Sequence, residues 1–427
     1  MALCACRKQR REANINFDDT PAEAEFRRTV RAWLDRCAPR ELLDDLTAAS
    51  FGNCHLKDRD IVVESKKWQR RKQEDGWACL QWPLEYGGRN ATPIQQVIWR
   101  QEEGLYVHLS TVFGLGLGMC GPTLIEWGSE EQKRRYVSRI ASGEEIWCQL
   151  FSEPSAGSDL AGIRARAEFR SESNSWVLNG QKIWTSLAHL ADYGMLLART
   201  DPNVPKHEGL TMFVVNMKSP GVECRPIKQI SGNSEFNEVY FDSVQIPDQQ
   251  RVGAPGKGWA VALTMLMNER LSIGTGMPTG FPELLALCEQ LEIDGRKSID
   301  DPAVRSRLAN WGVITSGLNH TASRAISALS KGQQPGPENS IGKLVAGATM
   351  QEIAAYALEL QGQAGVLDGA EAIDSARFQA LLMRSAATRI EGGTDEILRN
   401  IIAERVLGLP AEFRPDKGIP FNQIGKA

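Results

Sequence analysis

The stretch that decides the fold covers residues 147–186 and reads WCQLFSEPSAGSDLAGIRARAEFRSESNSWVLNGQKIWTS. It begins with a short apolar run at 148–151 and continues with a turn-rich polar segment at 152–159. Over residues 163–170, apolar and charged side chains then alternate strictly. Because successive side chains of a strand point to opposite faces, this alternation predicts a half-buried β-strand.

Two further strand-like runs, 176–178 and 181–184, flank the dipeptide Asn179-Gly180. Asn-Gly between two such runs is a strong signal for a tight β-hairpin, so we predict a turn there. A loop rich in hydroxyl groups and glycine would then lie on rigid β structure, followed by an exposed Trp-Thr-Ser edge. These residues leave two interpretations open: an ordinary β domain with polar turns, or a bed for a flat cofactor with polar edges.

Length and composition bound the class of protein. The chain has 427 residues, which is enough for two or three domains and a large core. Its apolar share of 42% and its charged share of 24% are typical of a soluble globular protein. A formal net charge of -4 argues against a nucleic-acid-binding surface, because such a surface needs a basic face.

The nine cysteines are odd in number, widely scattered and never spaced as a Cys-x-x-Cys pair. This pattern indicates a reducing compartment rather than a disulfide framework or a zinc site, and we predict no metal. No apolar run approaches the roughly 18 residues that a membrane span needs. The N-terminus places its basic residues after a very short apolar start, the reverse of a secretory signal. We therefore expect a flexible tail at 1–16 and a cytoplasmic protein.

The hydrophobic period changes twice along the chain. Residues 17–145 follow helical spacing, and Thr20-Pro21-Ala22-Glu23 combines an N-cap, a first-turn proline and a capping-box acid. Residues 146–250 alternate in short runs between turns, which predicts a small β-barrel or sandwich. Residues 251–427 return to helical spacing, and we predict a helical bundle. The predicted fold class is thus α+β with three domains: helices, a β-barrel, and helices. The clearest expected segments are a strand at Leu210–Asn216 and helices at Gly258–Ile273, Pro302–Ser330, 370–389 and 395–407.

Glu269 is the first candidate for acid–base chemistry. It follows a nearly all-apolar helical segment. Ala262, Met265 and Leu266 lie seven, four and three residues before it, on the same helical face. A carboxylate aimed into an apolar surface has a raised pKa, which suits a general base. The competing interpretation is a plain ion pair with Arg270 or a solvated helix end, and both remain open.

Glu391 is the second candidate. We expect it to end a helix directly before Gly392-Gly393, which break the chain ahead of Thr394 as the N-cap of the last helix. A bare Gly-Gly backbone at a helix start lets a ligand approach closely. A plain helix–turn–helix would explain the same residues.

Several motifs together resemble the acyl-CoA dehydrogenase family, and they occur in the expected order over nearly the whole chain after the tail. They are Phe151-Ser152-Glu153-Pro154 with Ala156-Gly157-Ser158-Asp159, NGQKIW at 179–184, Asn268-Glu269-Arg270, GGTDEI at 392–397 and RNIIAER at 399–405. The resemblance implies a helical N-terminal domain, a middle β-barrel and a C-terminal helical bundle. This is the same outline that the periodicity predicts.

The resemblance implies FAD as the cofactor and an acyl-CoA thioester as the substrate. The residues that match positions lining the isoalloxazine ring are Gln149, Phe151, Ser152, Trp184 and Ser186. Those that match positions around the adenosine and pyrophosphate of FAD are Arg296, Gly362, Thr394 and Glu396. Ser158 matches a position that contacts the acyl-CoA, and we expect Arg270, next to the candidate base, on the substrate side.

The implied reaction is α,β-dehydrogenation to the trans-2-enoyl-CoA, in which a glutamate takes the α-proton and the β-hydride passes to flavin N5. Electrons would then pass to an electron-transferring flavoprotein. Typical members of the family are homotetramers, and some are mixed tetramers of two related chains. A neighbouring subunit would therefore complete the cofactor site.

Two branches of the family place the base differently. One has it in a Glu-Gly-Thr sequence near the C-terminus, but here Gly392 takes that position and Glu391 lies one residue early. The other branch pairs Gly-Gly-Thr with a glutamate immediately before a helix arginine, which matches Glu269-Arg270. We therefore favour Glu269 as the base over Glu391.

The chain departs from the family pattern around the adenosine. Residues 296–300 read RKSID where Arg-x-x-Phe-Gly is common, and the expected glutamine is shifted to Gln361. Two other functions fit the same motifs. One is a flavin-dependent oxidase or monooxygenase that uses oxygen, and the other is a non-catalytic partner chain in a mixed tetramer.

Overall fold

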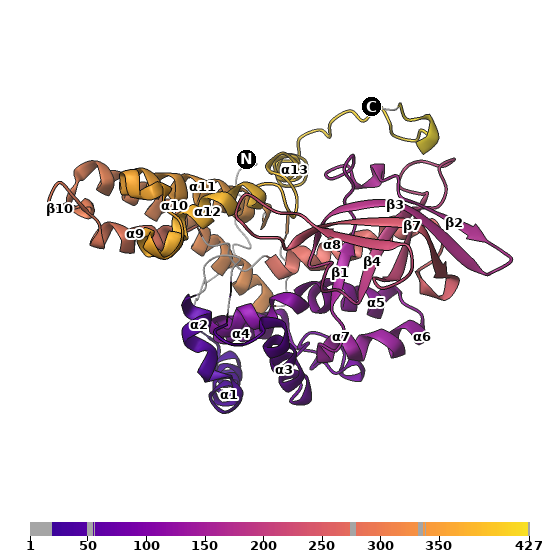
Figure 1. Cartoon of the computed structure of the whole chain (residues 1–427), viewed down its shortest axis with the longest axis horizontal. Helices are drawn as coiled ribbons and strands as arrows, with labels where there is room; N and C mark the ends of the chain where they lie inside the picture. Colours follow the sequence, from indigo (N-terminus) through magenta and orange to yellow (C-terminus); the bar gives the residue numbers. More distant parts are fainter. Residues whose placement is uncertain are drawn as a thin grey trace, which may run out of the picture.

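The computed structural model describes residues 19–48, 54, 56–273, 279–331, 336–337 and 339–425. Figure 1 shows three parts in chain order: helices α1 to α7 at the bottom, a sheet at the right, and C-terminal helices that extend to the left as an arm. The predicted fold class of helices, sheet and helices is therefore confirmed. The domain boundaries after residues 16, 145 and 250 stay predictions.

The N-terminal helices surround an aromatic core. The predicted capping box is present, because the Thr20 side chain accepts from the Glu23 N–H while the Glu23 carboxylate accepts from the Thr20 N–H. Trp33, Trp77 and Trp99 pack with ring centroids between 5.0 and 5.8 Å apart. The helices are α1 (Pro21–Cys37), α2 (Leu43–Ala48), α3 (Ile61–Glu74), α4 (Pro93–Glu103), α5 (Gly121–Trp127), α6 (Glu130–Gln132) and α7 (Ser138–Ser142), with a 3₁₀ segment at Gly104–Phe113 and π turns at Gly116–Cys120 and Lys133–Val137.

The middle of the chain forms one eight-stranded sheet. Its strands follow the order β6-β7-β3-β2-β4-β5-β8, and β1 pairs in parallel with β4. Inward side chains from six of the strands, among them Leu150, Leu178, Phe213 and Phe241, meet in one core, so the sheet curls around its own interior. The strands are β1 (Trp147–Leu150), β2 (Arg166–Arg170), β3 (Ser175–Ser186), β4 (Tyr193–Arg199), β5 (Leu210–Asn216), β6 (Val222–Pro226), β7 (Phe236–Pro247) and β8 (Arg251–Val252).

The predicted hairpin at Asn179-Gly180 is wrong. Both residues lie inside β3, and the turn that joins β2 to β3 lies at 171–174, where Asn174 has a φ of +47°. Asn179-Gly180 instead marks an irregularity in the pairing of β3 with β7. The Asn-Gly signal is local, whereas pairing with a distant strand keeps β3 continuous through it.

Gly180 is required where it stands. Its φ is +143°, and a Cβ built on it would lie 2.6 Å from Ala165 Cβ and 2.7 Å from Ala165 Cα. We expect Gly180→Ala to lower the free energy of unfolding by about 2–4 kcal/mol, because backbone strain and overpacking act together. The control is Gly87→Ala, where φ is +82° but nothing lies within 4 Å, so the loss should be about 1–2 kcal/mol. Urea unfolding compares the variants, and equal losses would contradict the contact argument.

The C-terminal helices include α8, which packs beneath the sheet, and an arm built from α9 to α12 (Figure 1). Helices α8 and α10 and strand β5 have the predicted bounds, but α12 begins at Arg377 and not at residue 370. Among the described residues no single helix is long and apolar enough to cross a membrane, and one bent pair within 93–127 passes that test by length and composition only. The elements are α8 (Gly258–Ile273), α9 (Phe281–Gln290), β9 (Glu292–Ile293), β10 (Arg296–Lys297), α10 (Pro302–Ser330), α11 (Asn339–Gln361), α12 (Arg377–Thr388) and α13 (Asp395–Ile401).

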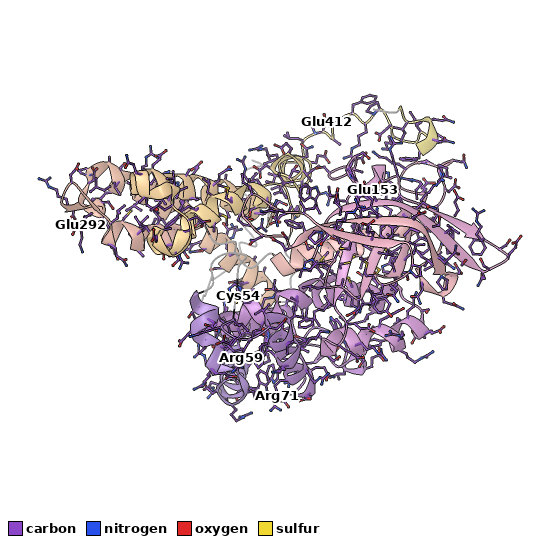
Figure 2. All side chains as sticks on the ribbon, in the orientation of Figure 1. Cys54, Arg59, Arg71, Glu153, Glu292 and Glu412 are labelled. Atoms are coloured by element: carbon purple, nitrogen blue, oxygen red, sulfur yellow. The ribbon has the colours of Figure 1, made fainter. Side chains whose placement is uncertain are left out.

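The last helix is shorter than predicted. It ends at Ile401 and a π turn follows at Ile402–Val406. The chain then leaves α13 as an extended segment and returns to the sheet, where it forms a 3₁₀ turn at Phe421–Gln423 (Figure 1). Figure 2 labels Glu412 on this segment and Glu153 among the strands.

Candidate active site

The ends of β1 and β3 bring five candidate residues together, which we call the β1–β3 bed. Ser152 follows β1 directly, and its carbonyl accepts a hydrogen bond of 2.9 Å from the N–H of Ile183 in β3. This bond joins two segments that are 31 residues apart in the chain. The members of the β1–β3 bed are Gln149, Phe151, Ser152, Trp184 and Ser186.

Trp184 is the unusual residue of the β1–β3 bed. Its backbone has a φ of +59°, a left-handed conformation that costs a non-glycine residue about 1–3 kcal/mol. Its side chain is nevertheless 56% exposed, and the indole meets Phe236 edge-on with ring centroids 6.1 Å apart. A large apolar ring held in a strained backbone and left exposed points to a ligand surface.

Polar atoms in and beside the β1–β3 bed lack protein partners. The Nε2 of Gln149, the Nε1 of Trp147 and the Oγ1 of Thr185 are buried without a hydrogen bond. Burying a polar group without a partner costs about 1–3 kcal/mol, so such atoms call for a ligand or water. A flat ring system with nitrogen and oxygen atoms along its edge fits this combination of an exposed indole and unpaired donors.

A buried ion pair between Lys182 and Glu153 links β3 to the segment that follows β1. The Lys182 ammonium is 2.8 Å from a Glu153 carboxylate oxygen and donates to the Phe151 carbonyl at 2.9 Å. The same carboxylate accepts from the N–H groups of Arg164, at 2.6 Å, and Ala165, at 2.9 Å. Burial lowers the pKa of Lys182, and Glu153 opposes that shift. Both residues occur within the motifs found in the sequence, but the sequence alone assigns them no role. A lysine four residues after Leu178 in a predicted strand is the available signal.

Ser158 lies on an exposed loop, residues 154–162, which we call the Ser158 loop. The loop is anchored at its start by paired backbone bonds of 3.0 Å between Glu153 and Ala156. Further along, the Asp159 carboxylate lies 2.8 Å from the Lys206 ammonium. Ser158 is therefore presented to solvent on a segment that other residues hold in place.

Helix α8 carries Glu269 and Arg270, whose side chains lie outside the described residues. The face that leads to Glu269 is the buried one, since Ala262 and Met265 are both 0% exposed in the core against the sheet. The predicted apolar face is therefore confirmed for Ala262 and Met265, while Leu266 is only partly buried against the same core. The predicted rise in the pKa of Glu269 stays a prediction.

Glu391 does not end a helix. Helix α12 ends at Thr388, and Glu391 lies in the turn that follows, where its carboxylate accepts from the Arg384 guanidinium at 2.5 Å. Gly392 has a φ of +61°, and the Thr394 side chain caps α13 by accepting from the Ile397 N–H, as predicted. A carboxylate oxygen already engaged by a guanidinium is poorly placed to receive a substrate proton.

The adenosine candidates do not gather in one chain. Lys343, near the start of α11, donates to the carbonyl of Gly393, next to Thr394. Gly362 follows the other end of α11, about 27 Å further along the helix axis. Arg296 lies on β10 at the far tip of the arm (Figure 1), and Glu396 lies on α13. In one chain, the residues that match adenosine positions therefore lie in two separate places.

The candidate position at Gly362 adjoins buried polar groups without partners, as the β1–β3 bed does. Gln361 is 7% exposed, and both its side-chain Nε2 and Oε1 lack hydrogen-bond partners. Gly362 has a φ of +56°, with open space around the position of a Cβ. No group of three or more metal-ligating side chains occurs in the part of the chain that the structure describes.

Three family models cover most of the chain. The N-terminal, middle and C-terminal domains of acyl-CoA dehydrogenase match residues 20–144, 148–244 and 256–407. Acyl-CoA dehydrogenase IpdE1 of Mycolicibacterium smegmatis is 38% identical over 401 residues, covering 91% of this chain and 98% of that protein. Acyl-CoA dehydrogenase FadE34 of Mycobacterium tuberculosis is 39% identical over 352 residues, covering 82% of this chain and 47% of its own length.

Solved structures of the same architecture superpose over nearly the whole chain. The ChsE4-ChsE5 complex from Mycobacterium tuberculosis gives a TM-score of 0.76 at 28% identity and covers 93% of this chain and 100% of the matched one. The Tcur3481-Tcur3483 steroid acyl-CoA dehydrogenase gives a TM-score of 0.75 at 25% identity with the same coverage.

Proposed function

Because the chain belongs to the acyl-CoA dehydrogenase family and is therefore an FAD-dependent oxidoreductase, we propose that it converts an acyl-CoA thioester to the trans-2-enoyl-CoA with Glu269 as the base. The observation that carries this proposal is the β1–β3 bed. It combines an exposed indole on a strained backbone with buried polar atoms that lack partners. Both features fit the ring of a flavin.

The β1–β3 bed would hold the flavin ring, with Trp184 against it and Gln149, Ser152 and Ser186 along its polar edge. When bound, FAD supplies the acceptor for the β-hydride. Phe151 is 5% exposed and packs in the core, so its part would be to fix the bed from beneath. Lys182 and Glu153 would keep the β1 end and β3 at a constant spacing.

The proton would be taken by Glu269. A thioester α-proton is only weakly acidic, so its removal needs a carboxylate with little water around it and a donor for the negative charge on the carbonyl oxygen. Helix α8 presents its buried, apolar face toward the sheet up to Met265, one turn before Glu269. Ser158 and Arg270 would lie on the substrate side of the site.

A second subunit would complete the cofactor site. Thr394 and Glu396 lie near one end of α11 and Gly362 at the other, so one FAD cannot contact both sets in one chain. We propose a tetramer, of one chain or of two related chains, in which Arg296 and Gly362 come from a neighbour. The complex of ChsE4 with ChsE5 is a precedent for two related chains. An electron-transferring flavoprotein would reoxidise the enzyme in the cytoplasm, in keeping with the free state of the seven described cysteines.

The acyl group is open to experiment. Thioesters with straight-chain, branched, dicarboxylic, aromatic or steroid acyl groups all suit the chemistry. The similarity to a steroid acyl-CoA dehydrogenase puts steroid-derived thioesters first in the order of testing.

Anaerobic mixing of the purified, FAD-loaded protein with a panel of acyl-CoAs tests the function. We expect at least one thioester to bleach the visible absorbance of the flavin in a single turnover, at roughly the 1–10³ s⁻¹ typical of enzymes. The bleached flavin should reoxidise slowly in air and rapidly with an electron-transferring flavoprotein. Rapid reoxidation by oxygen would instead identify an oxidase. A chain that binds no FAD alone but gains it on adding a related chain would identify a non-catalytic or mixed-tetramer partner.

A further inference from the structure

The described part of the C-terminal segment contacts the sheet. After α13 the chain crosses to the sheet, and residues 416–424, which we call the C-terminal strap, lie along the loop between β4 and β5 (Figure 1). The N–H groups of Phe421 and Asn422 donate to the carbonyls of Val204 and Pro202, each at 2.9 Å. The Asn422 side chain also donates to the Asn203 side chain at 2.9 Å. The strap is therefore bonded to this loop through its backbone as well as its side chains.

The Phe421 ring covers a buried cation. Its centroid lies 3.8 Å from the guanidinium carbon of Arg199, which is 4% exposed, and 5.7 Å from that of Arg164. Burial lowers the pKa of Arg199 to about 10, so the group stays charged at neutral pH. The Nε of Arg199 has no hydrogen-bond partner, so the ring face is the neighbour that offsets part of its burial.

Arg199 also hydrogen-bonds to the β4–β5 loop and to the Ser158 loop. Its guanidinium donates to the carbonyl of Ala161, at 2.5 Å, inside the Ser158 loop, and to the carbonyl of Lys206, at 2.6 Å. The strap, the β4–β5 loop and the Ser158 loop thus share one cation. Removing the Phe421 ring should therefore loosen the Arg199 side chain and its hydrogen bond to the Ala161 carbonyl.

Lys206 makes a second connection between the same three segments. Its ammonium lies 2.5 Å from the carboxylate of Asp416 in the strap and 2.8 Å from that of Asp159 in the Ser158 loop. The Lys206 side chain is 15% exposed and that of Asp416 26%, so water screens this pair less than it would on an open surface, whereas Asp159 is 62% exposed and its pair with Lys206 is more open to water. The Asp159 carboxylate of the Ser158 loop is therefore paired with a lysine that Asp416 of the strap also binds.

We propose that the C-terminal strap positions the Ser158 loop for the CoA part of the substrate, with Phe421 and Asp416 acting through Arg199 and Lys206. This inference rests on the proposed function, because that function gives Ser158 its role at the substrate. Phe421 and Asp416 are positioning residues and do not touch the reacting atoms. The strap therefore sets how well the substrate binds and leaves the chemical step alone.

The test compares Phe421→Ala with Phe413→Ala in the FAD-loaded protein. Phe413 lies on the same segment and is 84% exposed, so its removal controls for a change in the tail itself. We expect hydrogen exchange of the peptide covering 156–165 to quicken in Phe421→Ala and to stay at the wild-type rate in Phe413→Ala. KM for the acyl-CoA should rise about ten-fold in Phe421→Ala with kcat little changed, the pattern of lost substrate binding. Phe421→Tyr keeps the ring and should restore both values, and Asp416→Ala should act like Phe421→Ala.

The exchange measurement needs no substrate. It therefore tests whether the strap holds the Ser158 loop independently of the reaction. Exchange over 156–165 that is unchanged in both Phe421→Ala and Asp416→Ala overturns the proposal. Faster exchange with an unchanged KM overturns the link to substrate binding. If none of the acyl-CoAs bleaches the flavin of the wild-type protein, the proposed function fails. The exchange rates alone then decide whether the strap holds the Ser158 loop in place.

Discussion

Replacing Glu269 by glutamine is expected to lower the rate of flavin bleaching by acyl-CoA by about 10²–10⁴-fold, because positioned proton transfer contributes that much to a reaction. Glutamine keeps the shape of the side chain, but its amide cannot take up the α-proton. The variant should retain FAD with the wild-type absorbance, since the β1–β3 bed lies on β1 and β3 and not on α8. Anaerobic stopped-flow absorbance measures the first turnover directly.

Glu391→Gln is the comparison that assigns the base. The Glu391 carboxylate is engaged by Arg384 and lies in a turn after α12, so its replacement should slow bleaching far less than Glu269→Gln does. The opposite order, with Glu269→Gln active and Glu391→Gln inactive, would show that Glu391 is the base. Loss of FAD in either variant would be visible in the absorbance before substrate is added.

Lys182→Met is expected to lower the free energy of unfolding by about 3–5 kcal/mol, the usual cost of breaking a buried ion pair from one side. Lys182 is 0% exposed, and its loss leaves the Glu153 carboxylate buried with only the N–H groups of Arg164 and Ala165. The Phe151 carbonyl also loses its donor. Because these atoms support the β1–β3 bed, FAD content should fall together with stability. Denaturant unfolding of the apoprotein and flavin content of the purified protein measure the two effects.

Lys218→Met is the matched control for this prediction. It removes a lysine that is also paired with an aspartate, Asp192, at 2.7 Å, but that lysine side chain is 75% exposed. Exposed pairs contribute little, so the unfolding midpoint should hardly move. The double replacement Glu153→Gln with Lys182→Met removes both charges and should recover part of the loss. An unchanged midpoint for Lys182→Met alone would contradict the structural role of the pair.

Long segments with a clear period could be predicted from the sequence. Helices α8 and α10 and strand β5 have the predicted bounds, because packing on the core and local preference favour the same conformation there. The hairpin at Asn179-Gly180 failed because its turn signal competes with the pairing of β3 and β7, which local sequence does not encode. Helix α12 begins late because residues 374–376 all adopt a left-handed backbone, which periodicity does not report.

In the candidate site, too, some features could be predicted from the sequence and others could not. Ser152 and Trp184 could be named from motifs, and the Ser152 carbonyl accepts from the N–H of Ile183, the residue before Trp184. The contact of Arg199 with Phe421 could not be found, because it joins a buried strand end to a tail more than two hundred residues later. Neither residue carries a local pattern that points to the other. Such contacts depend on topology, and the sequence predicts residues 408–427 only as part of the helical bundle, with no element of their own.

The length of α11 has a genetic consequence. In the proposed assembly, each cofactor site draws Thr394 from one chain and Gly362 from another, since about 27 Å of helix separates them within a single chain. A damaging substitution at Thr394 or at Gly362 would then inactivate a site to which two chains contribute. Two alleles damaged at opposite ends of α11 can complement each other in a mixed assembly, whereas two alleles damaged at the same end cannot. Whether two damaged alleles restore activity together would therefore depend on which ends of α11 they affect.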